Sequence, residues 1–348
     1  MKRAFTSSAS ILLSLVLCLS GGALCVWLHT PLPWMIGPLL AMGLGKVFGL
    51  PLENVPAGRQ AGQLIIATAL GLYFTPDVAQ QLLGYGFFMI VGALLAVGLG
   101  MLSAWILHRL TDTDWPTAYF ASVPGGAAEM AVLGERFGAR AERVALSQSL
   151  RIALIVLTVP AAIIATGAHG SEVYHPATQS LDHAKLALML ALGGAGGWLL
   201  NRMRVPNAWM LGPLFVSIAL TVTGSHFSAF PLPLSNLGQL LIGWALGSRF
   251  ERSFMLSAPR FLVAVLLSVA AALGVACVFA LLFAWLLELP RATMLLALTP
   301  GGIAEICITA KVLQLGVPIV TAFHVVRVLV LVTGSASIYH WLARLDPH

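Results

Sequence analysis

The stretch Pro124–Glu129 has the sequence PGGAAE, and it recurs 176 positions later as Pro300–Glu305, with the sequence PGGIAE. Each copy lies in otherwise apolar sequence. Proline lacks a backbone N–H and glycine places no side-chain restraint on the backbone, so a helix is expected to open at both copies. In each copy a glutamate follows the second glycine by three residues. The duplicated motif therefore predicts two opened helices, each with a carboxylate near the start of the helix that resumes.

The composition is that of a polytopic helical membrane protein. The 348 residues are 59% hydrophobic and 9% charged, whereas an average soluble domain has about 25% charged residues. The formal net charge of +6 comes mostly from basic residues in short polar connections, where they orient helices in a bilayer. We therefore expect a lipid bilayer and no nucleic acid as a partner.

The apolar segments fall into two matching halves. In the first half they cover residues 8–28, 33–50, 60–75, 84–108, 116–134 and 143–166, and in the second half 184–200, 207–224, 234–249, 259–287, 291–313 and 317–342. Trp34–Leu39 matches Trp209–Leu214, and Gly62–Leu64 matches Gly238–Leu240. Internal repeats of this length are typical of secondary transporters. The sequence predicts a first membrane repeat over residues 1–166, a periplasmic connecting loop over 167–183 and a second repeat over 184–348.

The N-terminal segment resembles a signal peptide, because Lys2 and Arg3 precede an apolar run. We expect it to remain in the protein, since Gly21-Gly22-Ala23 matches Gly193-Gly194-Ala195 and places the segment within the repeated unit.

The distribution of basic residues predicts that the two repeats are inverted. If all six segments of each half crossed the bilayer, arginines such as Arg136, Arg202 and Arg249 would face outwards, against the positive-inside tendency. If one segment per half does not cross, each half has about five crossings, and 14 of the 19 basic residues lie on the cytoplasmic side together with both termini. Either the Pro-Gly-Gly segments are re-entrant, or they are broken crossing helices and a short segment such as 33–50 does not cross. The sequence leaves this choice open.

Four charged residues lie deep in the apolar segments: Glu129, Glu305, Arg151 and Arg327. A charge at the centre of a bilayer costs about 2.5–3.5 kcal/mol on insertion scales, so such residues mark functional sites or buried ion pairs. The functional interpretation is a midplane site where helix N-termini attract an anionic group or a buried glutamate carries a proton. The structural interpretation is that each glutamate pairs with an arginine of the next helix.

Other polar residues occupy matching positions in the halves. Gln63 and Gln239 could bind a solute or bond a neighbouring helix. His324 takes the place of Gln148 and could relay protons, or serve as a packing residue. Trp34 and Trp209 are expected to anchor at a membrane interface, with Gly-Pro allowing a kink or close packing. The candidate substrate- or ion-binding residues are therefore Pro124, Gly125, Gly126, Glu129, Pro300, Gly301, Gly302, Glu305, Arg151, Arg327, Gln63, Gln239 and His324.

Several chemistries are not favoured. The sequence contains no Walker or dinucleotide-binding glycine pattern, so neither ATP nor NAD is expected. The four cysteines, Cys18, Cys25, Cys277 and Cys307, have no metal-ligand spacing. The only concentration of histidines is His169, His175 and His183, at irregular spacing in one polar loop. No enzymatic activity, cofactor or metal is predicted.

The paired motifs Trp-Met-x-Gly-Pro-Leu, Gly-Gln-Leu and Pro-Gly-Gly-x-Ala-Glu resemble those of the AbrB duplication family of bacterial inner-membrane proteins. The resemblance covers about residues 10–343. Family members are often labelled ammonia monooxygenase or AbrB family transcriptional regulator, and the family looks akin to cation:proton antiporters and anion transporters. The resemblance implies a secondary transporter in the bacterial inner membrane.

Our first hypothesis is therefore a secondary transporter or exporter of a small polar or anionic solute, coupled to protons or another ion. The alternatives are a membrane-embedded sensor that regulates gene expression indirectly, and, less favoured, a membrane oxygenase. A homodimer would be compatible with the first hypothesis, since dimers are common among inverted-repeat transporters.

Overall fold

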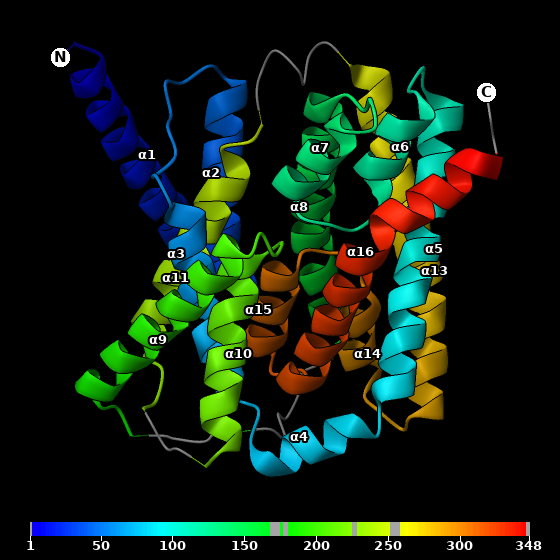
Figure 1. The fold of residues 1–348 in the computed structure, drawn as a ribbon. Helices are drawn as coiled ribbons and strands as arrows, with labels where there is room; N and C mark the ends of the chain where they lie inside the picture. Colours follow the sequence, from blue (N-terminus) through cyan, green and yellow to red (C-terminus); the bar gives the residue numbers. More distant parts are fainter. Residues whose placement is uncertain (1, 168–174, 177–179, 225–227, 251–257, 346–348) are drawn as a thin grey trace. The chain divides into compact units, whose positions relative to one another are not determined.

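A computed structural model describes residues 2–167, 175–176, 180–224, 228–250 and 258–345 (Figure 1). Within these ranges the chain forms 15 helices and no strand, which confirms the predicted all-α class. Five of the described helices are long and apolar enough to cross a membrane: Ser8–Trp27, Gly86–Leu110, Ala141–Ala165, His183–Arg202 and Pro259–Leu286. Most of the predicted connecting loop, including His169, lies outside the described residues.

The chain divides into two compact units, and each unit combines segments from both halves of the sequence. Unit 1 covers residues 1–79, 156–258 and 307–318, and unit 2 covers residues 80–155, 259–306 and 319–348. Four of the described helices have residues in both units: the short helix α4 (Pro76–Leu83), α8 (Ala141–Ala165), α15 (Ile303–Leu313) and α16 (Val317–Leu345).

Unit 1 is built from matching helix pairs of the two halves. Its helices are α1 (Lys2–Trp27), α2 (Pro33–Val47), α3 (Gly58–Gly71), α9 (His183–Arg202), α10 (Ala208–Val222) and α11 (Leu232–Gly247). The pairs in closest contact are α1 with α2 and α9 with α10, while α3 packs on both α10 and α11. In the α3–α10 contact, the hydroxyl of Ser217 donates a hydrogen bond of 2.8 Å to the carbonyl of Thr68.

Each Trp-Met-x-Gly-Pro-Leu motif forms a close helix crossing in unit 1, of α2 with α1 and of α10 with α9. A Cβ on Gly37 would overlap with the backbone of Gly21, and one on Gly212 would overlap with the backbone of Gly196 and Gly197. The Trp34 ring covers Gly22, where an added Cβ would lie 2.8 Å from the ring. Trp209 packs in the same way on Gly197. The expected close packing at Gly-Pro is present, and each tryptophan ring is half-buried against a glycine of the neighbouring helix. Anchoring of these rings at a membrane interface stays a prediction.

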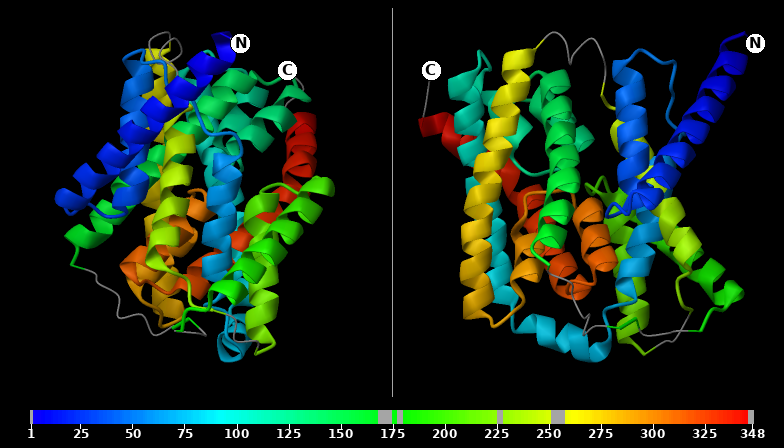
Figure 2. Two further views of the ribbon diagram at one scale, coloured as in Figure 1. Left: turned by 90° about the vertical axis from the view of Figure 1, so that its left-hand side faces the viewer. Right: turned by 180° about the vertical axis from the view of Figure 1, so that it is seen from behind.

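Unit 2 is organised around two long helices, α5 (Gly86–Leu110) and α13 (Pro259–Leu286), which lie side by side (Figures 1 and 2). Leu99, Ala272 and Ala276 form a buried apolar cluster between them, and the Ser103 hydroxyl donates to the Ser268 carbonyl at 3.3 Å. The short helix α6 (Trp115–Ser122) packs on α5, and α14 (Arg291–Leu298) packs on α13. Unit 2 also contains α7 (Ala127–Glu135), the first part of α8 and most of α16, and it holds both Pro-Gly-Gly segments.

Candidate functional site at two helix breaks

The helical backbone is interrupted at both Pro-Gly-Gly segments. Helix α6 ends at Ser122 and α7 begins at Ala127, and we call the residues between them, Val123–Gly126, the first break. Likewise α14 ends at Leu298 and α15 begins at Ile303, and Thr299–Gly302 is the second break. Val123 and Thr299 have nearly the same extended conformation, with ψ of 129° and 130°. The following proline explains this, because its ring disfavours the helical conformation of the residue before it.

Each glutamate folds back over the glycine at the start of its own helix. Gly126 is the N-cap of α7, and a Cβ added there would overlap with the Glu129 carboxylate. A Cβ on Gly302 would overlap with the Glu305 carboxylate in the same way. An alanine at either position would force the glutamate side chain to move away from the start of the helix. The negative carboxylates lie where the helix N-termini carry partial positive charge, which is a stabilising arrangement.

The two arginines bind the carbonyl ends of the helices that precede the breaks. Arg151 on α8 donates from Nη1 to the Ser122 carbonyl at 3.0 Å. Arg327 on α16 donates from Nη1 to the Thr299 carbonyl at 2.8 Å and from Nη2 to the Gly301 carbonyl at 2.6 Å. The last carbonyls of a helix have no partner within the helix and carry partial negative charge, so a guanidinium is well suited to cap them. Both arginines are only 5% exposed.

Gln148 and His324, one turn before the arginines, complete the caps. The Gln148 amide donates to the carbonyls of Phe120 and Val123, each at 2.8 Å, and its oxygen accepts from Arg151 Nη2 at 2.6 Å. The His324 Nε2 lies 2.9 Å from the Leu296 carbonyl. In the second half, where His324 takes the place of Gln148, the second nitrogen of Arg327 binds the Gly301 carbonyl instead.

The charged groups of the two halves influence one another. The guanidinium groups of Arg151 and Arg327 are close enough to repel each other, and Glu305 is close enough to attract Arg151. Glu305 is 3% exposed, whereas Glu129 is half-buried. The structure thus gathers eleven of the predicted site residues, all those at the two breaks and on α8 and α16, within unit 2.

Gln63 and Gln239 lie in unit 1, on α3 and α11. The helices cross beside them, where a Cβ on Gly62 would come within 2.8 Å of the Gly238 carbonyl oxygen. Both amides are buried. Their position at a close crossing of two helices is compatible with the packing role that the sequence analysis weighed for them.

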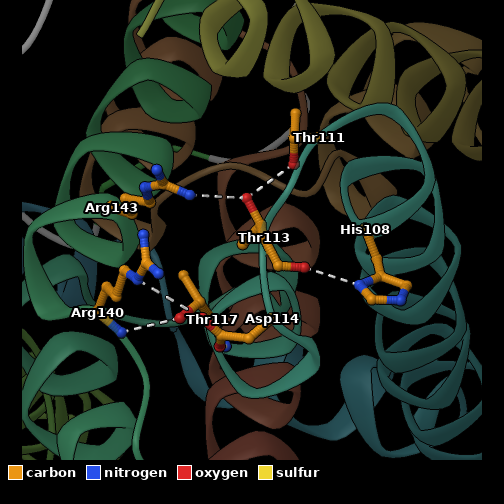
Figure 3. Close-up of polar contacts among 7 residues, drawn as sticks. All are labelled: His108, Thr111, Thr113, Asp114, Thr117, Arg140 and Arg143. Carbon is orange, nitrogen blue, oxygen red and sulfur yellow. Dashed lines mark hydrogen bonds and ion pairs between the residues drawn. The ribbon is translucent and has the colours of Figure 1, made fainter. Parts of the chain in front are cut away.

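A polar cluster that was not predicted from the sequence lies at the starts of α6 and α8 (Figure 3). It joins the connection between α5 and α6 to the connection between α7 and α8. The backbone N–H of Arg140 donates to the Thr117 hydroxyl at 2.8 Å, and Arg143 donates to the Thr113 hydroxyl at 3.2 Å. Asp114 caps α6 by accepting from the Thr117 N–H at 2.8 Å, and it lies 3.8 Å from Arg140 Nε.

The pKa of Asp114 is lowered in the folded protein. Partial burial alone would raise this pKa, but hydrogen bonds from Thr117 and the positive charge of Arg140 outweigh it. The native state therefore binds the Asp114 proton less tightly than the unfolded state, whose aspartate pKa is about 3.9. The resulting stabilisation is complete above about pH 3.9 and is lost as the pH falls through the lower native pKa.

We expect Asp114→Asn to reduce the loss of stability between pH 5 and pH 3, because asparagine keeps the N-cap but does not titrate. Thermal unfolding of the purified protein in detergent at several pH values measures this. The two proteins should lose stability at different rates only in the acid range. Parallel pH profiles would show that Asp114 does not contribute to acid unfolding.

Comparisons with known proteins match most of the chain. A family model described as "Transition state regulatory protein AbrB" matches residues 34–343. A Bacillus subtilis (strain 168) protein, "Uncharacterized protein YhjN", is 26% identical over 351 residues, covering 94% of this chain and 91% of the relative. An Escherichia coli (strain K12) protein, "Putative regulator AbrB", is 27% identical over 331 residues, covering 92% of this chain and 93% of the relative.

Proposed function

We propose that this chain, which belongs to the AbrB family, is a secondary transporter of a small polar or anionic solute. The proposal starts from that family membership and from the charged groups buried at the two helix breaks. One observation carries the proposal: each half contributes an arginine and a glutamate to opened backbone inside an apolar, helical unit. Opened backbone at membrane depth is tolerated only where it is buried in protein or lines a water-filled cavity. Paired discontinuous helices with charged ends are typical of transporter binding sites.

We further propose that the Pro-Gly-Gly segments are re-entrant and that the two repeats are inverted, with about five crossings each. The contacts of Arg140 with Asp114 and Thr117 support this topology for the first half, because both ends of the segment 114–140 lie together (Figure 3). A straight helix of that length would separate its ends by about 40 Å. In Figure 1, α6 and α7 lie towards one end of unit 2 and α14 towards the other. Together with the distribution of basic residues along the sequence, this topology favours a location in the bacterial inner membrane with both termini on the cytoplasmic side.

The glutamates are the proposed coupling groups. Their carboxylates occupy the N-terminal ends of α7 and α15, which are the places where an anionic group of a solute would otherwise bind. A solute anion can use these sites only when a glutamate is displaced or protonated. Proton binding to the glutamates and solute binding would then be linked, as coupled transport requires.

The test is transport by the purified protein in proteoliposomes under an imposed pH gradient, with ¹⁴C-labelled lactate, propionate and glycerol as probes. We expect gradient-driven accumulation by the wild type and its loss in Glu129→Gln combined with Glu305→Gln. Glu142→Gln, a change near the start of α8 outside both breaks, serves as the control. Undiminished accumulation by the double variant would remove the proposed coupling role, and absence of flux for all three probes in the wild type would contradict transport of this solute class.

A sensor is the second candidate function, favoured by the name of the Escherichia coli relative as a regulator. A sensor with the same buried site would bind a probe without moving it across the bilayer. Binding by thermal shift together with zero flux would favour the sensor over the transporter, because a ligand that binds the native state raises its melting temperature.

A further inference from the structure

Gln148 and His324, which occupy matching positions at the two breaks, differ in how completely their side chains are hydrogen-bonded. In the first half, Gln148 uses both its amide nitrogen and its oxygen. In the second half, His324 uses only Nε2, and its Nδ1 is buried without a hydrogen-bond partner among the described residues. The Thr321 hydroxyl is likewise buried without a partner in the described part of the chain. Both residues are 0% exposed.

The hydrogen bond to Leu296 determines what the free atom of His324 can do. A carbonyl oxygen only accepts, so Nε2 must carry the hydrogen that it donates. In the neutral ring, Nδ1 then holds a lone pair and can only accept. His324 is therefore suited to accept a hydrogen bond at Nδ1.

Thr321 is a second buried polar residue on α16. It precedes His324 by three residues on α16, so the two side chains share one face of the helix. The corresponding residue of the first half, 176 positions earlier, is Ala145, which has no polar group. An unbonded buried polar group costs about 1–3 kcal/mol, so two of them on one helix face are a strong indication of an absent partner.

We propose that His324 and Thr321 together form a hydrogen-bonding site for the transported solute. The site belongs to the second half of the chain and has no counterpart in the first half. The inference rests on the proposed transport function and narrows its substrate class. The solute must present a hydrogen-bond donor to Nδ1, and that donor is uncharged, because Arg327, one turn further along α16, repels a cationic group. A hydroxyl group or the O–H of a protonated acid meets both requirements. One solute binds per chain, although the motifs are duplicated.

The experiment observes His324 directly by ¹⁵N NMR of the full-length protein, labelled with ¹⁵N-histidine, in lipid nanodiscs. The His324 signals are identified by their loss in His324→Gln, a substitution compatible with the fold because Gln148 occupies the matching position. The probes are lactate and glycerol, which carry hydroxyl groups, and propionate, which is lactate without its hydroxyl. We expect an unprotonated Nδ1 at rest, and a saturable shift of its signal with lactate or glycerol and not with propionate at neutral pH.

The variants separate solute recognition from structure. Thr321→Ala, which reproduces Ala145 of the first half, should weaken the response to the hydroxylated probe at least tenfold, and Thr321→Ser should restore it. Ser149→Ala is the control, because the Ser149 hydroxyl bonds a carbonyl of its own helix. A protonated Nδ1 at rest, an equal response to propionate, no response to any probe or an unchanged response in Thr321→Ala would each overturn the proposal. Flux in proteoliposomes with a silent His324 would overturn only this inference, whereas binding at His324 without flux would overturn only the transport function.

Discussion

Gly302→Ala is expected to lower solute transport by on the order of 100-fold while the protein remains folded, since a displacement of about 1 Å in a functional group can have an effect of this size. The methyl group would occupy the space of the Glu305 carboxylate, which must then leave the N-terminus of α15. The favourable interaction between carboxylate and helix end is lost with it. Gly126→Ala is expected to act in the same way on Glu129. Initial rates in proteoliposomes, normalised to the amount of inserted protein, measure both effects.

The chain offers a matched pair of control positions for these glycines. Gly98 on α5 and Gly274 on α13 are also separated by 176 residues, and an added Cβ would meet no atom within 4 Å at either position. Alanine should therefore be tolerated there, and should stabilise each helix by about 0.4–1 kcal/mol. If Gly302→Ala transported at the rate of Gly274→Ala, the position of the Glu305 carboxylate would not matter for transport.

The long helices could be predicted from the sequence, because a long apolar segment of a membrane protein has few conformations open to it other than a helix. The predicted segments 84–108 and 259–287 correspond to α5 at Gly86–Leu110 and α13 at Pro259–Leu286. The eight-residue helix α4 was missed, because Pro76–Leu83 is amphipathic and has no long apolar run. The division into two units was also beyond prediction, since each unit combines segments from both halves.

The charged members of the site could be found from the sequence, but many of their partners could not. Arg151 and Arg327 stand out because a charge in an apolar segment is costly. An ion pair with a glutamate was one prediction for each arginine, and the structure shows hydrogen bonds to the carbonyls of Ser122, Thr299 and Gly301. Backbone carbonyls are common to every residue, so no sequence pattern identifies the ones that are left free at a helix break. The repeat nevertheless contained information about these partners. Gln148 and His324 occupy matching positions, and they precede Arg151 and Arg327, respectively, by one turn.

Arg327→Met is expected to lower the free energy of unfolding by about 2–6 kcal/mol, because it leaves two buried carbonyls without a donor at about 1–3 kcal/mol each. Methionine approximates the length of the arginine side chain, so the lost hydrogen bonds dominate the effect. Arg151→Met should cost less, since Arg151 binds one backbone carbonyl and the oxygen of Gln148, whose amide can adjust. Arg327→Lys should fall between the wild type and Arg327→Met, because an ammonium group keeps the charge but lacks the planar fork that reaches two carbonyls.

Unfolding of the purified variants in detergent, followed by heat and by denaturant, measures these differences. Arg260→Met is the control, because Arg260 is exposed at the start of α13, and a surface change of this kind is expected within about 0.5 kcal/mol of the wild type. Equal stability of Arg327→Met and Arg260→Met would mean that water replaces the guanidinium at the second break. The break would then be hydrated in the resting protein, and a solute would reach His324 by displacing water and not by entering a closed site. The ranking of these variants therefore distinguishes a site that is sealed by its arginines from one that is already open to water.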